Sequence, residues 1–363
     1  MNFRPVSDLT RPSIRGTKPL PEPAPVSQVL LLMIVHLCRK ILFIDPSIKV
    51  GVYVLAVFFG SVVADVLPIP RSYFSYKDNF LNIYFVKWSW GWTMVLVGTF
   101  LYLTSKVYCC GDNLRIRRHF GRLLIATAGW LFFTRSFVHI EDNYGYCSKN
   151  VIGRKNCLHK GHIWQGFSIS GHTFILIYCT LILMEEAKAL IGWEGIKDFL
   201  RLEEYNRANE EGEGTALENL SDKQFESTKA FYEKYTPYVR ITFIGMAMLS
   251  LIWDVMLIST TLYFHTTPEK FVASICAVLF WFGTYRFWFL SSNWLSPGLP
   301  GEGVFQYMNP RQPMLSATLL RRRSSLRLKY ISKTTDKIPT FMGMPLNPLR
   351  NAVPPSQYAV ATE

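Results

Sequence analysis

The sequence predicts an all-α integral membrane protein: a bundle of about six transmembrane helices with both termini in the cytosol. Of its 363 residues, 49% are hydrophobic and 15% are aromatic. Several apolar runs reach the roughly 18 to 20 residues that cross a bilayer. The net charge of +13 comes from basic residues between and beyond these runs, so it indicates membrane topology and no nucleic-acid partner.

The N-terminal region, residues 1–45, is expected to be cytosolic. It begins with a polar, basic, proline-rich stretch without an early apolar segment, so no cleavable signal peptide is expected. The run from Val26 to Ile44 is apolar but contains Arg39 and Lys40. These charges favour an amphipathic helix in the membrane interface over a transmembrane span.

Six longer apolar runs form a predicted membrane domain over residues 46–290. Each is long enough, at 1.5 Å per residue, to cross roughly 30 Å of hydrocarbon. The long polar connection 191–237 is expected to be a solvated loop with a helical turn or two, and residues 291–363 a basic, Ser- and Pro-containing cytosolic tail. The expected spans are about 47–67, 84–104, 119–140, 168–190, 238–264 and 270–290.

The distribution of charge predicts the orientation. With six spans, the side that holds both termini carries 25 Lys and Arg residues and the other side seven. The positive-inside rule therefore places both termini in the cytosol. Arg135 and Asp254 fall inside expected spans, where a charge costs roughly 2.5 to 3.5 kcal/mol on insertion scales. We expect them to form an ion pair within the bundle or to serve a substrate.

The lumenal loop 141–167 contains Cys147 and Cys157, ten positions apart. In an oxidising lumen they could close a disulfide, and two free thiols are the alternative. His159 and His162 lie in the same loop, but two ligands without nearby cysteine or carboxylate spacing make a poor zinc site. No metal and no other cofactor are therefore expected.

Two histidines are predicted to meet at the lumenal face, because span four begins there and span five ends there. Ser170-Gly171-His172 opens span four. Ser168 or Ser170 can cap the helix, and Gly171 lets a ligand approach the free N–H groups, an arrangement that suits a phosphate. His172 would then donate a proton to a leaving oxygen.

His265 follows span five, just before Pro268. A neutral imidazole there could attack phosphorus and carry a phosphoryl group. Each histidine alone could instead be an interfacial hydrogen-bonding residue, but their pairing by topology favours catalysis. Lys87, near the lumenal interface, is well placed to hold a phosphate.

The sequence resembles the fat storage-inducing transmembrane (FIT) family of the endoplasmic reticulum between about residues 46 and 300. The terminal extensions lie outside this resemblance. The stretches that carry it are Asn82-Ile-Tyr-Phe-Val-Lys87, Ser170-Gly-His172 with its apolar run to Glu185-Glu186, Tyr263-Phe-His265, Gly283-Thr-Tyr285 with Phe287-Trp288, and Ser296-Pro-Gly-Leu-Pro300.

The resemblance implies kinship with lipid phosphate phosphatases, with His172 as general acid and His265 as nucleophile. It implies a multi-pass protein of the endoplasmic reticulum membrane that cleaves the diphosphate of fatty acyl-CoA to acyl 4′-phosphopantetheine and adenosine 3′,5′-bisphosphate. The implied cellular role is lipid-droplet formation and membrane lipid homeostasis. The alternative is a non-catalytic protein that binds diacylglycerol and triacylglycerol in the bilayer. No protein partner is indicated.

The chain departs from the wider phosphatase pattern in three places. Ile258-Ser259 stands where that pattern has Ser-Arg, so a phosphate-binding arginine is missing. Glu269 replaces the aspartate that orients the second histidine. The first phosphate-binding motif is not recognisable, and Lys77 or Lys87 would have to substitute for it.

Overall fold

The computed structural model describes residues 25–149, 153–209, 217–291 and 296–305, and the backbone at 340–341 and 344–345. The chain divides into two units, Met1–Asn309 and Pro310–Glu363. In the second unit, β3 (Thr340–Phe341) pairs antiparallel with β4 (Met344–Pro345). Residues 1–24 and the rest of the predicted tail lie outside the described residues.

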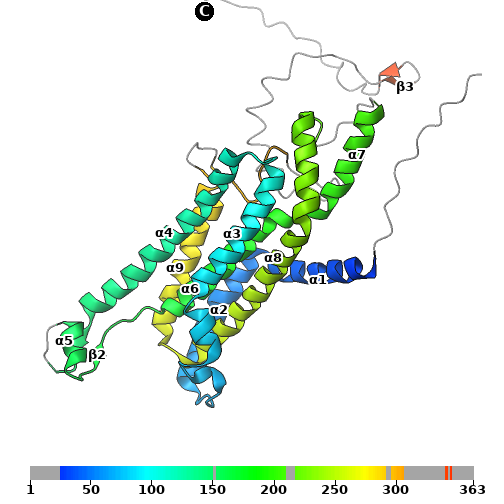
Figure 1. Ribbon diagram of the computed structural model, residues 1–363. Helices are drawn as coiled ribbons and strands as arrows, with labels where there is room; N and C mark the ends of the chain where they lie inside the picture. The colour runs from blue at the N-terminus through cyan, green and yellow to red at the C-terminus, as the bar shows by residue number, and fades with distance from the viewer. Residues whose placement is uncertain are drawn as a thin grey trace, which may run out of the picture. The chain divides into compact units, whose positions relative to one another are not determined.

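The first unit is a bundle of helices (Figure 1). Its short elements are η1 (Tyr73–Ser75), the π-helix η2 (Asn82–Val86), β1 (Tyr146–Cys147), α5 (Arg154–His159), β2 (Trp164–Gln165), η3 (Lys188–Leu190), η4 (Trp193–Gly195) and the π-helix η5 (Phe282–Trp288). Its longer helices are α1 (Val26–Leu42), α2 (Pro46–Val66), α3 (Ser89–Tyr108), α4 (Asn113–Tyr144), α6 (Gly171–Ala187), α7 (Ile196–Asn209), α8 (Asp222–Tyr263) and α9 (Thr267–Trp281).

Helix α6 occupies the centre of the bundle. Every residue from Thr173 to Ala187 is buried, and the helix packs against α8, α9 and α3. Its sequence is apolar on all sides, which is typical of a helix enclosed by others. The Ser170-Gly171-His172 motif therefore stands at the end of the most enclosed helix of the protein.

Among the residues that the structure describes, four helical segments are long and apolar enough to cross a membrane: Pro46–Val66, Asn113–Tyr144, Asp222–Tyr263 and Thr267–Trp288. The chain is thus a mostly helical, multi-span membrane protein. The two other expected spans are also helical, as α3 and α6. Helix α6 has only 17 residues, and α3 begins with Ser, Trp, Gly and Trp, so neither belongs to the four.

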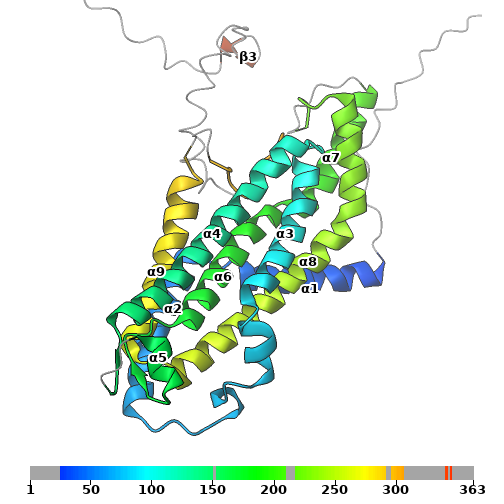
Figure 2. The same cartoon turned by 60° about the vertical axis from the view of Figure 1, so that its left-hand side comes forward.

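In the connection 191–237, the described residues 191–209 and 217–237 are packed and largely helical, and the expectation of a solvated loop was wrong. Helix α8 has 42 residues and begins at Asp222, where Ser221 and Gln224 form a capping box. Helix α7 and the first part of α8 run side by side (Figure 2). Trp193 is fully buried beneath them, and its Nε1 donates to Thr236 Oγ1 at 3.2 Å.

Helix α1 crosses the direction of the bundle helices in both views (Figures 1 and 2). Its buried residues, Val35, Cys38 and Leu42, pack toward α8, while Leu30 and Met33 are 59% and 64% exposed. An exposed apolar face on a helix of this orientation is what an interfacial helix would place in the lipid headgroup region.

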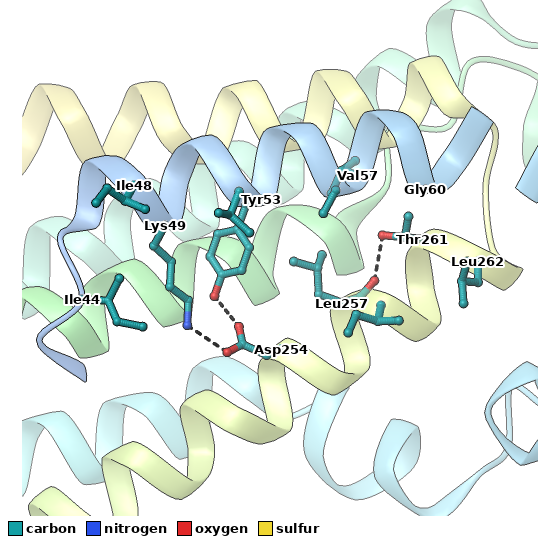
Figure 3. A pocket seen from close by; sticks show the side chains of 13 residues that line it. Ile44, Ile48, Lys49, Tyr53, Val57, Gly60, Asp254, Leu257, Thr261 and Leu262 are labelled. Atoms are coloured by element: carbon teal, nitrogen blue, oxygen red, sulfur yellow. Dashed lines mark hydrogen bonds and ion pairs between the residues drawn. The ribbon is translucent and has the colours of Figure 1, made fainter. Parts of the chain in front are cut away.

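Asp254 pairs with Lys49 and Tyr53, not with Arg135 as the sequence suggested. Lys49 Nζ lies 2.8 Å from Asp254 Oδ2, and the Tyr53 hydroxyl donates to Oδ1 (Figure 3). The reason is helix adjacency: α2 packs on α8, whereas α4 packs on α3 and α6. Arg135 is exposed on α4.

A second buried polar cluster lies at the far end of α6 from His172. Arg122 makes a bidentate pair with Glu186, at 2.7 and 2.9 Å, and both side chains are 2% exposed. The hydroxyl of Tyr285 donates to the same carboxylate at 2.8 Å, and Arg122 also donates to the Gly298 carbonyl at 3.3 Å. The cluster thereby joins α4, α6, η5 and the 296–305 segment at the end of the bundle opposite the histidines.

Candidate active site

The two histidines lie at the same end of the bundle. His172 stands in the first turn of α6, and His265 in the turn between α8 and α9. The two elements are tied together by backbone bonds, since the Ser170 N–H donates to the Glu269 carbonyl at 3.3 Å. His172 is half-buried, and His265 and Lys87 are close enough to interact with it electrostatically.

Ser170 caps α6. Its Oγ accepts from the Thr173 N–H at 3.3 Å and shares a hydrogen bond with Thr173 Oγ1 at 2.9 Å, and the residue is fully buried. Of the two serines considered from sequence, Ser170 is therefore the cap. Ser168 acts through its backbone, whose N–H donates to Glu269 Oε1 at 2.9 Å.

Gly171 faces open space. Apart from its chain neighbours and the backbone of its own helix, a Cβ atom built at this position would meet no atom within 4 Å, so packing against other parts of the protein does not require a glycine here. The adjacent N–H groups belong to the first turn of α6, which has no intrahelical acceptor for them. A phosphate could therefore approach this backbone directly.

His265 has a left-handed backbone conformation, with φ of 59°. Non-glycine residues adopt this region at a cost of roughly 1–2 kcal/mol, and such strain is concentrated at functional sites. The residue makes a tight turn between Phe264, which ends α8, and Thr266, which caps α9. The turn leaves the imidazole 28% exposed at the end of the bundle.

Glu269 connects the two halves of the site. Its Oε1 accepts from the Ser168 N–H, and its Oε2 accepts from the Thr266 N–H at 3.0 Å as part of the capping box of α9. The same Oε2 lies 3.4 Å from His265 Nδ1. One carboxylate thus fixes the loop before α6, the start of α9 and the imidazole.

The two candidate lysines lie in different positions. Lys87 follows η2 and is exposed, close enough to His172 to act on its charge. Lys77 is also exposed, and its backbone carbonyl accepts from Asn82 Nδ2 at 2.6 Å. The buried Asn82 also accepts the Lys87 N–H on its carbonyl at 3.0 Å, so it organises the segment that carries both lysines.

Lys270 is a buried cation beside this site that was considered from sequence only as a topology signal. It is 1% exposed, and its Nζ donates to the Thr261 carbonyl near the end of α8 at 2.7 Å. A cation at a helix C-terminus interacts favourably with the unpaired carbonyls there. Its position directly after Glu269 in the sequence was the feature that could have indicated a cation beside the site.

The loop before α6 is held by covalent and polar contacts. Cys147 and Cys157 are joined by a disulfide, with Cα atoms 5.8 Å apart. Arg154 lies 3.1 Å from Glu141 and 3.0 Å from Asp142 at the end of α4, and these carboxylates raise its pKa. The short β1–β2 pairing returns the chain toward Ser168.

No group of three or more His, Cys, Asp and Glu side chains suited to a metal occurs in the parts of the chain that the structure describes. The residues present suit another chemistry. Two imidazoles, one of them facing a carboxylate, stand beside an open helix N-terminus and a lysine, an arrangement suited to phosphoryl transfer.

Fold and site together define a multi-span helical membrane protein with a two-histidine site at one end of its bundle. The family model described as fat storage-inducing transmembrane protein matches residues 70–146 and 138–285. The chain belongs to this family.

Curated relatives agree with the family model. The chain is 42% identical to the acyl-coenzyme A diphosphatase FITM2 of Drosophila melanogaster, over 95% of this chain and 86% of that protein. It is 31% identical to the protein of the same name from Mus musculus and 30% to that from Homo sapiens, each over 69% of this chain and 84% of the relative. No solved structure matches the chain.

Proposed function

We propose that this protein is a fatty acyl-CoA diphosphatase of the endoplasmic reticulum membrane, acting on the lumenal side. Its products would be acyl 4′-phosphopantetheine and adenosine 3′,5′-bisphosphate. The observation that carries the proposal is the convergence of His172 and His265 at one end of the bundle, joined through Glu269. The printed name of the relatives supports the choice of substrate.

His265 is the nucleophile in this proposal. Its Nδ1 faces Glu269, so a proton on Nδ1 leaves Nε2 free to attack. Nε2 forms a bond to one phosphorus of the diphosphate, and the bond from that phosphorus to the bridging oxygen breaks. Water then attacks the phosphohistidine and restores the free imidazole.

His172 is the general acid. It gives its proton to the bridging oxygen as that oxygen leaves, and in the second step it accepts a proton from the attacking water. Its half-buried position in the first turn of α6, beside Gly171, sets it against the same phosphate that the helix N-terminus would bind.

The phosphate is held by backbone and cation together. Ser170 orders the first turn of α6, the open face of Gly171 admits the phosphate, and Lys87 supplies positive charge in place of the missing arginine. Lys77 is a second candidate cation on the same segment.

The topology belongs to the same proposal. Six spans, the four named above together with α3 and α6, would leave both termini in the cytosol and the histidines in the lumen. This orientation agrees with the excess of basic residues on the terminal side. It also places the disulfide loop in an oxidising compartment. The cellular role would be lipid-droplet formation and membrane lipid homeostasis.

The rival function is non-catalytic binding of diacylglycerol or triacylglycerol, which partitions neutral lipid for droplet budding. Neutral lipids contain no phosphate, so this function has no use for a nucleophile and a proton donor.

The deciding experiment assays purified protein in lipid nanodiscs against palmitoyl-CoA, phosphatidic acid and a lysophospholipid. Release of adenosine 3′,5′-bisphosphate, lost in a His265→Asn variant of unchanged thermal stability, is expected. A wild-type protein inert toward palmitoyl-CoA would rule out the proposed activity.

A further inference from the structure

A groove of about 730 Å³ lies between α2 and α8, outside the site described above (Figure 3). The exposed surface of its walls is almost entirely apolar. Its aliphatic side chains include Ile48, Val52, Ala56, Val57, Leu257 and Ile258.

The groove opens on a face that a bilayer would cover. Ile48 and Ile258 line it and are 63% and 60% exposed, on two segments long and apolar enough to span a membrane. Apolar side chains with this exposure would be in contact with lipid tails. A hydrocarbon chain could therefore enter from the side, out of the membrane.

One end of the groove reaches the candidate active site. Thr261 and Leu262 line that end, in the last turn of α8, and His265 follows three residues after Leu262. Helices α2 and α8 approach closely here, since a Cβ at Gly60 would come within 2.9 Å of Thr261 Cγ2. In fatty acyl-CoA the pantetheine arm separates the diphosphate from the acyl chain, so a substrate with its diphosphate at His265 would run this arm along the end of the bundle and insert its tail at Thr261 and Leu262.

The other end contains the cluster of Lys49, Tyr53 and Asp254. The ammonium of Lys49 and the hydroxyl of Tyr53 both donate to the carboxylate of Asp254, so these polar groups are hydrogen-bonded within the protein. Along α2, Lys49 lies eleven residues from Gly60, or roughly 16 Å at the helical rise. A chain that passes the cluster toward Ile48 would have to lie against charged groups.

We propose that this groove holds the fatty acyl chain of the substrate and that the Lys49–Tyr53–Asp254 cluster limits the chain length that fits. The inference rests on the proposed function, because it takes the phosphate of the same molecule to lie at the histidines. The acyl chain moves from the lipid bilayer into an apolar groove, so it gains little free energy from the hydrophobic effect. The groove therefore contributes to catalysis by positioning the substrate.

The first test fills the groove. Ala56→Trp places an indole among the lining residues, and Leu55→Trp places the same group on α2 outside the groove. Ala56→Trp should lower kcat/KM for palmitoyl-CoA by roughly ten- to hundredfold and change that for butyryl-CoA little, because misplacement by about 1 Å can cost 10²-fold. Leu55→Trp should leave both values unchanged. Equal losses for the two substrates in Ala56→Trp would overturn the proposal.

The second test removes the limit. The double variant Lys49→Met with Asp254→Leu replaces the pair by apolar groups, a change that is often neutral or stabilising for a buried pair. Its ratio of kcat/KM for behenoyl-CoA over palmitoyl-CoA should rise several-fold. An unchanged ratio in a folded double variant would overturn the role of the cluster.

A binding measurement separates this inference from the proposed activity. The probe is a palmitoyl-CoA analogue with a terminal diazirine and a methylene in place of the bridging diphosphate oxygen. It should label α2 and α8 peptides in wild type and Leu55→Trp, but much less in Ala56→Trp. Labelling of the groove by the analogue, without hydrolysis of palmitoyl-CoA, would support the groove assignment and contradict the proposed activity. Hydrolysis with labelling elsewhere, or labelling of the groove only by a diacylglycerol analogue, would overturn the groove assignment.

Discussion

Oε2 of Glu269 lies 3.4 Å from Nδ1 of His265, while both oxygens of the same carboxylate accept backbone N–H groups from Ser168 and Thr266. The orientation of the imidazole is therefore tied to the loop that precedes α6. This link makes Glu269 the positioning residue of the site, since it acts through His265.

Replacing Glu269 tests that link. Glu269→Gln keeps an oxygen for one backbone N–H but removes the charge that stabilises a protonated imidazole, so kcat should fall by at least about 10²-fold with KM little changed. Glu269→Asp should recover part of the loss because the carboxylate remains. Steady-state kinetics on palmitoyl-CoA gives both values. A parallel rise in KM with kcat intact would assign Glu269 to substrate binding instead.

The left-handed backbone at His265 predicts a trade between stability and activity. His265→Gly should abolish turnover and raise the free energy of unfolding by about 1 kcal/mol, because glycine adopts this conformation without strain. His265→Asn, which also tolerates the conformation, should be inactive at wild-type stability. Chemical denaturation in detergent compares the three proteins. A glycine variant less stable than wild type would mean that the side chain contributes more than the strain removes.

The helix ends could be predicted from sequence because their caps are local. Asp45 followed by Pro46 begins α2, and Ser170 begins α6. The order of the spans then brings His172 and His265 to one face without knowledge of packing. The contact of Glu269 with Ser168 was not predictable, since it depends on the path of the loop before α6.

What the sequence failed to predict depends on which helices are neighbours. The partner of Asp254 could not be chosen between Arg135 and Lys49 without knowing that α2 packs on α8. The packing of 191–237 was missed because its apolar residues, such as Trp193 and Phe225, occur singly among charges. The capping box at Ser221 and Gln224 was the one local signal of the longer helix.

Gly171→Ala tests whether a ligand occupies the open space at the start of α6. The added methyl meets no protein atom within 4 Å, and the substitution should leave stability unchanged or slightly increased. If a phosphate approaches this backbone, KM for palmitoyl-CoA should rise about tenfold or more. Gly51→Ala on α2, which is equally open, is the matched control and should leave KM unchanged. Wild-type kinetics in Gly171→Ala would place the phosphate elsewhere.

The proposed topology predicts where glycans can be added. A sequon engineered into 153–160, within the disulfide loop, should be glycosylated in microsomes, because that loop would lie in the lumen. The native sequon Asn219-Leu220-Ser221 should remain unmodified in the same protein, since the connection 191–237 would be cytosolic. Mobility shifts reversed by endoglycosidase report both sites, and a glycan on Asn219 would reverse the orientation.

Because the two histidines have different tasks, the activities of their variants should depend differently on the leaving group of the substrate. If His172 protonates the leaving oxygen, His172→Gln should slow palmitoyl-CoA cleavage by roughly 10²- to 10⁴-fold. In the same variant the initial burst of p-nitrophenolate from p-nitrophenyl phosphate should be nearly as fast as in wild type, because that leaving group departs without a proton. His265→Asn should lose both reactions, since no other group supplies the nucleophile. Acid-labile phosphoryl enzyme should accumulate in His172→Gln and be absent from His265→Asn. Equal slowing of both substrates in His172→Gln would show that His172 holds the phosphate instead of donating a proton.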